Sequence, residues 1–419
     1  MQIKSCTFNL HGFVIFLNFG KIIDEDMKIE GYIERSLTES IKKAIPFYPV
    51  IVITGPRQVG KTTLCRHIFE DFRYVNLERP TERQFALDDL EGFVDGLGPR
   101  AIIDEIQNVP AILSYIQVKV DENPELKYVI TGSSNFSLLH NITQSLAGRA
   151  ALFTLLPLSF KEIKDYIAST GIREIMYNGF YPAIFTKATP PDMFYSNYYS
   201  TYVERDIRQI SQLKNIDTFE TFMRLCAGRT GSELNYSSLG VETGVSAPTV
   251  KEWLSLLNAS YITYTLQPYF TNINKRLTKS PKLYFYDTGL LCFLLGIENA
   301  DQLMTHPLRG AIFENLVVSE MMKEKYNSGK LPKLFFYREN SGREVDIVEE
   351  QGTALYLYEV KASKTFSKDF RKNLEYMKKT LTNIEIKDSI VVYDGDTFPP
   401  FAINVRDMWK YNENKNRAN

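Results

Sequence analysis

The stretch from Val50 to Thr63 reads VIVITGPRQVGKTT, and it decides how the first half of the chain folds. Four apolar residues predict a buried strand, which leads into a glycine, four further residues and then Gly60-Lys61-Thr62. This order of strand, glycine-containing loop and helix start is that of the Walker A motif. The glycines let backbone amides point inward around an anionic phosphate, and the helix beginning at Lys61 adds the positive end of its dipole. The sequence therefore predicts a nucleoside triphosphate site.

The residues of this loop have separate predicted roles. Lys61 would reach the β- and γ-phosphates, and the Thr62 hydroxyl would be a ligand of Mg²⁺. The residues expected to surround the nucleotide are Gly55, Pro56, Arg57, Gln58, Val59, Gly60, Lys61, Thr62 and Thr63. The alternative is a chance match in a surface turn. The apolar strand before the loop and the amphipathic helix after it argue against that alternative.

A second strand with acidic residues at its end follows about 45 residues later. Ala101 to Glu105 reads AIIDE, the form of a Walker B strand. Asp104 would hold Mg²⁺, and Glu105 would polarise the attacking water as the general base. A glutamate directly after the metal-binding aspartate is typical of the P-loop ATPases with an additional sheet strand. The alternating strand and helix pattern around it predicts an α/β domain with a parallel sheet.

A polar tip on a further strand predicts a residue that senses the γ-phosphate. Tyr128 to Thr131 forms the apolar strand, and Gly132-Ser133-Ser134-Asn135 follows it. Ser133 is the first candidate for contact with the γ-phosphate or the attacking water, and Asn135 is the second. A helix cap is the alternative role for Ser134 or Asn135.

Arg149 precedes the apolar run 150–156, the expected last strand of the sheet. In this ATPase class an arginine at that place often reaches into a neighbouring subunit, where it stabilises charge on the transferred phosphoryl group. If Arg149 acts in this way, the protein is a homo-oligomer. The alternative is a local pair with a carboxylate. Arg205 and Arg208 are competing candidates, on a segment whose mixed charges favour a solvated helix.

Composition narrows the class of protein. A net charge of −1 argues against a uniformly basic surface for nucleic acid, although local basic patches remain possible. The four cysteines, Cys6, Cys65, Cys226 and Cys292, lie far apart and lack zinc-type spacing. We therefore expect no disulfide framework and a reducing cytoplasm. No apolar run approaches the roughly 18–20 residues of a membrane span, so we expect no membrane segment.

The region after Phe219 has the sequence form of a winged helix. Two helical stretches, a third helix from Pro248 to Leu257 and an apolar alternation follow one another, with Ser246 as the expected helix cap. Groove-facing positions would be Thr249, Lys251 and Glu252. Backbone phosphates of DNA would be contacted by Lys275, Arg276, Lys279 and Lys282. The alternative is a packing module, in which Trp253, Leu254 and Leu257 are a buried helix face.

Three acids and a lysine stand out in the C-terminal region. Asp346 lies in one predicted strand, and Glu359 and Lys361 share one face of the next. The aspartate, twelve intervening residues and Glu-x-Lys are similar to the pattern of the restriction-endonuclease-like fold. Asp346 and Glu359 could hold Mg²⁺ with Glu314 from the preceding helix, and Lys361 would position the attacking water. A binding module without nuclease activity is the alternative.

The order of these parts resembles a known group of sequences. The pieces that match are GPRQVGKTTL, RAIIDEIQNVP, VITGSSN, LAGRAALFTLLPLSFKE, YVERDIRQI, SPKLYFYDTGLL and RGAIFENLVVSE. They resemble the bacterial and archaeal predicted ATPases of the AAA+ superfamily, in which an N-terminal AAA domain precedes a C-terminal domain of unknown function. The resemblance covers almost everything after Met27. It implies binding of ATP with Mg²⁺ and ATP hydrolysis.

The predicted architecture is α/β throughout, with a parallel P-loop sheet of the additional-strand type. Residues 1–26 are expected to be an extension outside any domain, with Met27 as an alternative start. The expected domains are an AAA+ ATPase core at 27–157, a helical lid or connector at 158–215, a winged helix at 216–300 and a restriction-endonuclease-like domain at 301–412.

Two functional hypotheses follow from these parts. In the first, the protein is a DNA-associated ATPase whose C-terminal domain binds or cleaves nucleic acid. In the second, it is a nucleotide-dependent switch or scaffold whose C-terminal domain binds a protein partner and has no nuclease activity.

Overall fold

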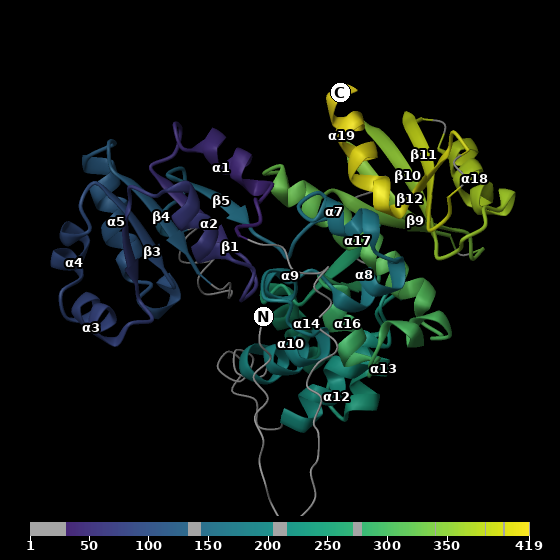
Figure 1. Ribbon diagram of the computed structural model, residues 1–419, viewed down its shortest axis with the longest axis horizontal. Coiled ribbons are helices and arrows are strands. Elements are labelled where there is room, and N and C mark those ends of the chain that lie inside the picture. The colour runs from purple at the N-terminus through teal and green to yellow at the C-terminus, as the bar shows by residue number, and fades with distance from the viewer. Residues whose placement is uncertain are drawn as a thin grey trace, which may run out of the picture.

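The computed structural model describes residues 31–132, 144–203, 216–270, 279–339, 341–381, 383–396 and 399–418. The N-terminal region, a helical middle region and the C-terminal region follow one another in space as they do in the chain (Figure 1), and the C-terminal region also contacts the first helix of the N-terminal region.

The first sheet is parallel and has five strands. Its members are β1 (Val50–Thr54), β2 (Arg73–Asn76), β3 (Arg100–Asp104), β4 (Lys127–Thr131) and β5 (Ala150–Thr154). The strand order is β2-β3-β4-β1-β5. Strand β4 thus lies between β1 and β3, and the sheet has the additional-strand order that the acidic pair predicted. Each predicted strand is found within two residues of its expected start.

Helices cover both faces of this sheet. They are α1 (Leu37–Ala44), α2 (Lys61–Ile68), α3 (Pro80–Asp88), α4 (Leu90–Gly96), the 3-10 turn η2 (Ile106–Asn108) and α5 (Ile112–Glu122). Because strand side chains alternate between faces, Ile51 and Ile53 pack in one apolar cluster, while Val50 and Val52 pack in the other. The sheet is therefore buried on both sides, as parallel sheets are.

The acidic stretch after β2 forms two helices. Helix α3 ends at Asp88, and α4 begins at Leu90. The carboxylate of Asp89 accepts a hydrogen bond from Gly92 N at 2.9 Å, so it caps the second helix. Aspartate competes for the backbone in this way, which explains the break.

The middle region is mainly helical. Its helices are α7 (Lys164–Ser169), α8 (Ile172–Asn178), α9 (Pro182–Thr186), α10 (Pro191–Tyr198), the π-helix η3 (Tyr199–Val203), α12 (Ile216–Ala227), α13 (Tyr236–Thr243), α14 (Ala247–Ala259), α16 (Thr288–Leu294) and the 3-10 helix η4 (Ala300–Met304). Ser246 caps α14, since its hydroxyl accepts from Thr249 N at 3.2 Å. Trp253, Leu254 and Leu257 are buried, as expected for the packing face of that helix.

The second sheet has seven strands and joins the middle region to the C-terminal region. Its strands are β6 (Thr263–Pro268), β7 (Lys282–Phe285), β8 (Leu334–Arg338), β9 (Glu344–Gln351), β10 (Ala354–Lys361), β11 (Ile386–Tyr393) and β12 (Ala402–Asn404), in the order β12-β11-β10-β9-β8-β6-β7. Strand β6 pairs antiparallel with β7 and parallel with β8. The ribbon of the expected winged helix is thus continuous with the C-terminal sheet.

The C-terminal helices are α17 (Arg309–Asn327), the 3-10 turn η5 (Lys368–Arg371), α18 (Lys372–Thr380), the 3-10 turn η6 (Val405–Asp407) and α19 (Met408–Ala418). Helix α17 contacts β7 and β10 and also reaches α1 of the N-terminal region. One apolar cluster accordingly runs from Ile33 to Met408 through all three regions. Within the described ranges, no helix is long and apolar enough to cross a membrane.

Candidate functional site

The loop between β1 and α2 has the backbone that an anion site requires. Gly55 and Gly60 have φ values of 143° and 90°, and Gln58 has a φ of 61°. A Cβ atom at Gly55 would lie 2.0 Å from Leu155 O, so only glycine fits where β1 and β5 end side by side. Residues 55–60 thus have the backbone shape expected of the predicted phosphate-binding loop, and they follow the carboxyl end of β1.

The ammonium of Lys61 closes this loop from inside. Its Nζ donates to Gly55 O at 2.9 Å and to Pro56 O at 2.8 Å, and the side chain is buried. Burial lowers the pKa of Lys61 to about 8, although Glu105 and Asp104 oppose the shift. The lysine therefore occupies its own loop, and it would exchange two carbonyl oxygens for phosphate oxygens when a nucleotide binds.

Asp104 lies at the end of β3 and receives hydrogen bonds from three elements. Thr62 Oγ1 donates to its Oδ2 at 2.8 Å, as the predicted Mg²⁺ pair requires. Tyr74 OH donates to the same oxygen at 2.7 Å, and Thr131 Oγ1 donates to Oδ1. The donor set of one hydroxyl and one carboxylate beside an anion loop fits Mg²⁺ held together with a nucleotide.

Two of these partners were missed in the sequence. Tyr74 lies on β2 and Thr131 at the end of β4, the strands on either side of β3. Their positions in the sequence could have indicated both residues. Polar residues near the carboxyl ends of neighbouring parallel strands lie close together in the folded sheet.

Glu105, the predicted general base, has a left-handed backbone with φ 59° and ψ 47°. This conformation is uncommon for a residue other than glycine, and such strain occurs often at functional sites. Gln107 Nε2 donates to its carboxylate, which fixes the direction of the side chain.

Two contacts from other parts of the chain support the loop. Arg35 donates to Val59 O at 2.7 Å, to Leu156 O at 2.6 Å and to Glu162 Oε1 at 3.1 Å. Tyr261 OH lies 3.1 Å from Thr54 Oγ1, directly before the loop. Neither residue was expected from the sequence, since each is more than 20 residues from its partner in the loop.

Arg149 lies at the amino ends of the strands, and the loop lies at their carboxyl ends. Val50 N donates to Arg149 O at the amino end of β1, whereas the loop follows the carboxyl end. The guanidinium pairs with Asp121, with Nη2 2.6 Å from Oδ2. Arg149 therefore cannot serve the site of its own chain, and the structure shows the local pair that the sequence left open. Ser133, Ser134, Asn135, Arg205 and Arg208 lie outside the described residues.

A second cluster of charged side chains lies on the C-terminal sheet. Lys361 Nζ is 2.7 Å from Glu359 Oε1 and 3.6 Å from Asp346 Oδ2. Asp346 Oδ2 also accepts from Val360 N at 2.7 Å. These three predicted residues thus lie together across β9 and β10.

The prediction that Lys282 contacts DNA phosphates is wrong. Lys282 is only 2% exposed, and its Nζ lies 3.1 Å from Glu314 Oε1 and also pairs with Glu344. The carboxylates of Glu314, Glu344 and Asp346 raise the pKa of Lys282 although burial alone would lower it. Lys279 and Lys251 remain exposed, and Lys275 and Arg276 lie outside the described residues.

The predicted metal site of Glu314, Asp346 and Glu359 is not assembled. In the part of the chain that the structure describes, no group of three or more His, Cys, Asp or Glu side chains could hold a metal ion. Two ammonium groups, those of Lys282 and Lys361, lie among the acids instead. Burial, with a further contribution from the nearby Asp346 carboxylate, raises the pKa of both Glu314 and Glu359 above the usual range of a glutamate.

Comparisons with known proteins agree with the first site. A family model described as "AAA domain" matches residues 48–164. Models of two domains of unknown function, DUF8612 and DUF4143, match residues 169–301 and 309–411. The geometry and the AAA match define the class of the N-terminal half, a P-loop ATPase domain of the AAA type, and support nucleotide-dependent ATPase activity.

Three similar proteins are named as uncharacterized. Uncharacterized proteins of Mycobacterium bovis and Mycobacterium tuberculosis are each 28% identical to this chain over 383 residues, which is 88% of this chain and 82% of each relative. An uncharacterized protein of Methanocaldococcus jannaschii is 23% identical over 435 residues, covering 93% of this chain and 91% of its own.

Two solved structures are similar in part. The Walker-type ATPase paby2304 of Pyrococcus abyssi has a TM-score of 0.43 and 15% identity, over 65% of this chain and 99% of its own. A signal transduction ATPase with numerous domains, PH0952 from Pyrococcus horikoshii, has a TM-score of 0.26 and 12% identity, over 71% of this chain and 48% of its own.

Two substitutions separate nucleotide binding from turnover. We expect Lys61→Ala to abolish ATP binding, because it removes the ammonium that is predicted to contact the phosphates. Glu105→Gln should keep binding and lower the hydrolysis rate by about 100-fold or more, since an amide cannot accept the proton of water. Calorimetry and a phosphate-release assay measure the two effects. Normal turnover in Glu105→Gln would contradict the role of Glu105.

Replacing Lys282 tests the charge cluster. Lys282→Met leaves buried acids without their cation, and we expect the free energy of unfolding to fall by about 3–5 kcal/mol. Lys279→Met, an exposed lysine three residues earlier, is the matched control. A melting temperature equal to that of the control would refute this account of the cluster.

Proposed function

We propose that the protein is a Mg²⁺-dependent ATP hydrolase that changes the state of its C-terminal region with each turnover. The observation that carries the proposal is the contact of Thr62 Oγ1 with Asp104 Oδ2 at 2.8 Å beside an anion-binding loop. It brings the hydroxyl and the carboxylate that hold Mg²⁺ to one point. The free thiols of Cys65, Cys226 and Cys292, all buried, are compatible with a reducing cytoplasm.

Each residue of the site has a separate proposed role in ATP hydrolysis. Backbone N–H groups of residues 57–60 would bind the phosphates, and Lys61 would move from Gly55 O and Pro56 O to the β- and γ-oxygens. Bound Mg²⁺, held by Thr62 and Asp104, would neutralise charge on those oxygens. Glu105 would accept a proton from the attacking water, and Ser133 would contact the γ-phosphate.

A continuous set of contacts supports transmission from this site to the C-terminal region. Arg35 holds Val59 O of the loop and Glu162. Glu162 accepts from Ser159 N at 2.8 Å, and the neighbouring Phe160 N donates to Glu320 of α17 at 2.7 Å. The same helix carries Glu314 in the charge cluster. A shift of the loop would therefore act on α17 through a chain of buried and partly buried hydrogen bonds.

We propose nucleic acid as the substrate class of the C-terminal region. Asp346, Glu359 and Lys361 lie together, as cleavage of a phosphodiester would require, and the exposed Lys251 and Lys279 of the winged-helix region could contact phosphates. The second candidate is a switch or scaffold that binds a protein partner. The pairing of Lys282 with Glu314 favours this candidate, because it leaves no metal site among the described residues.

The two candidates predict different results with DNA. The first predicts ATP hydrolysis that DNA stimulates and Mg²⁺-dependent cleavage that disappears in both Asp346→Ala and Glu359→Ala. Hydrolysis and cleavage are measured in parallel on wild-type protein with and without DNA. The second candidate predicts no DNA retention at low salt and no cleavage. Cleavage that persists in both variants would argue against this site.

We also propose that Arg149 acts in trans within a homo-oligomer. Mutual rescue tests this proposal. Arg149→Ala and Glu105→Gln should each be inactive alone, and mixing them should restore hydrolysis. The reason is that some sites would then combine Glu105 of one subunit with Arg149 of the next. A mixture as inactive as its components would show that Arg149 serves only its pair with Asp121.

A further inference from the structure

A polar groove lies between helix α14 and strand β6, and the residues just before β7 form a further wall. Its volume is about 580 Å³, within the usual range of about 300–1,000 Å³ for ligand sites. Lys251, Ser255 and Asn258 line it from α14, and their spacing places them on one face of that helix. Thr265 and Gln267 line it from β6, where every second side chain shares a face. One helix face and one strand face therefore build the groove.

Side chains of this groove are accessible, and several have unused hydrogen-bonding capacity. Ser255 and Ser280 are exposed and Gln267 is half-buried, and none of these three side chains has a hydrogen-bond partner among the described residues. Asn258 Oδ1 accepts from Thr263 Oγ1 at 2.8 Å, so the N–H groups of this amide are left for another acceptor. An occupant with many acceptor atoms would satisfy these donors.

The charged side chains of the groove are all positive. Lys251 and Lys279 are both exposed, and neither side chain forms an ion pair within the described ranges. The ammonium of Lys251 lies 5.2 Å from the centroid of the Tyr236 ring, so a cation–π contact holds it at the groove. No aspartate or glutamate is among the described residues that line the groove. The site is therefore suited to a ligand that carries several negative charges.

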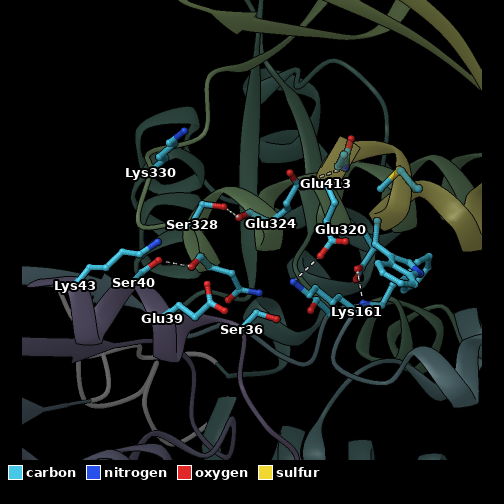
Figure 2. A pocket seen from close by; sticks show the side chains of 16 residues that line it. Ser36, Glu39, Ser40, Lys43, Lys161, Glu320, Glu324, Ser328, Lys330 and Glu413 are labelled. Carbon is cyan, nitrogen blue, oxygen red and sulfur yellow. Dashed lines mark hydrogen bonds and ion pairs between the residues drawn. The ribbon is translucent and has the colours of Figure 1, made fainter. Parts of the chain in front are cut away.

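Other cavities of the molecule have both signs of charge. Figure 2 shows the cavity whose walls include α1, α17 and α19, and it is lined by four glutamates and three lysines. A further cavity, of about 460 Å³, shares Lys279 and Ser280 with the groove. It is also lined by Glu233 and Glu339, and its Arg338 pairs with Glu233 at 3.4 Å. Because carboxylates repel phosphate oxygens, the groove beside α14 suits an anion best of these three sites.

We propose that this groove binds the sugar-phosphate backbone of single-stranded nucleic acid. The inference rests on the nucleic-acid substrate proposed above for the C-terminal region, and it assigns the form of that substrate and the place where it is held. The ammonium groups of Lys251 and Lys279 contact phosphate oxygens. The amides of Asn258 and Gln267 and the hydroxyl of Ser255 donate to further phosphate oxygens or to base atoms.

The shape of the site favours a single strand over a duplex. A duplex receives a protruding helix in its major groove, and such a helix presents its outward residues to the bases and phosphates. Helix α14 has the exposed acid Glu252 there, directly after Lys251, and a carboxylate repels the phosphates. The free donors lie instead in the concave space between α14 and β6. A concave, positively charged groove is the form in which proteins follow the backbone of a single strand.

Fluorescence anisotropy of labelled oligo-dT of about 12 nucleotides measures binding to the full chain. EDTA is present and ATP is left out, so that neither cleavage nor hydrolysis contributes. The proposal predicts that oligo-dT binds at least tenfold more tightly than a duplex of the same length. It also predicts that neither polyglutamate nor inorganic phosphate displaces oligo-dT at an equal concentration of charges. Equal affinity for the duplex would overturn the single-strand assignment, and displacement by polyglutamate would overturn nucleic acid as the occupant.

The salt dependence of binding locates the contacts. Each ammonium that neutralises a phosphate of a single strand adds about 0.7 to the slope of log affinity against log salt concentration. Lys251→Ala and Lys279→Ala should each lower that slope by about 0.7 and weaken oligo-dT at least threefold. Gln267→Ala should weaken binding with an unchanged slope, because it removes an uncharged donor. Lys43→Ala, an exposed lysine of the cavity in Figure 2, is the matched control and should bind like wild type. A wild-type slope in both groove lysine variants would overturn the location.

The groove and the proposed cleavage can fail separately. Retention of oligo-dT that disappears when Lys251 and Lys279 are both replaced by alanine supports the groove even if wild-type protein cleaves no DNA. Cleavage of single-stranded DNA that continues at the wild-type rate in that double variant would overturn the groove alone. Wild-type protein that retains no oligo-dT at low salt would overturn the groove as well.

Discussion

The relative positions of the strands and of the first helix after the loop in the ATPase region depend on the carboxylate of Asp104. It is buried at the end of β3, and three hydroxyl groups from α2, β2 and β4 donate to it. A buried charge without such donors would be costly, so the bonds hold the helix and the three strands in fixed relation. The Walker A loop is aligned with the Walker B strand through this one side chain, and the phosphate site follows from that alignment.

The same edge of the sheet is connected to the rest of the chain. Arg35 and Tyr261 contact the residues on either side of Gly55, from the start of the described chain and from the middle region. Helix α17 then extends from Glu314 in the charge cluster to Asn327 beside α1. The ATPase region therefore does not stand alone, because its loop, its first helix and the C-terminal region share one packed core.

Local sequence patterns predicted the strands and the loop well. The roles of side chains that depend on contacts between distant residues could not be predicted in this way. The apolar runs with Gly55, Gly60 and Asp104 are local signals, and each led to the right strand or loop. Lys282 is a residue for which the local pattern was misleading. Because it lies in a basic stretch, we predicted that it contacts phosphates of DNA. In the structure it lies on β7, where its ammonium pairs with Glu314 and Glu344. Its burial depends on residues more than 30 positions away, which no local pattern contains. Tyr74, Thr131 and Arg35 were missed for the same reason, since their roles exist only after the strands align.

We propose that Lys61, Thr62 and Asp104 form one nucleotide site. The most direct measurement is a crystal structure of the chain with Mg²⁺ and a non-hydrolysable ATP analogue. The account predicts that Lys61 Nζ leaves Gly55 O and Pro56 O and contacts the β- and γ-phosphates, with Mg²⁺ beside Thr62 and Asp104. An analogue bound elsewhere, with Lys61 still hydrogen-bonded to its own loop, would contradict it.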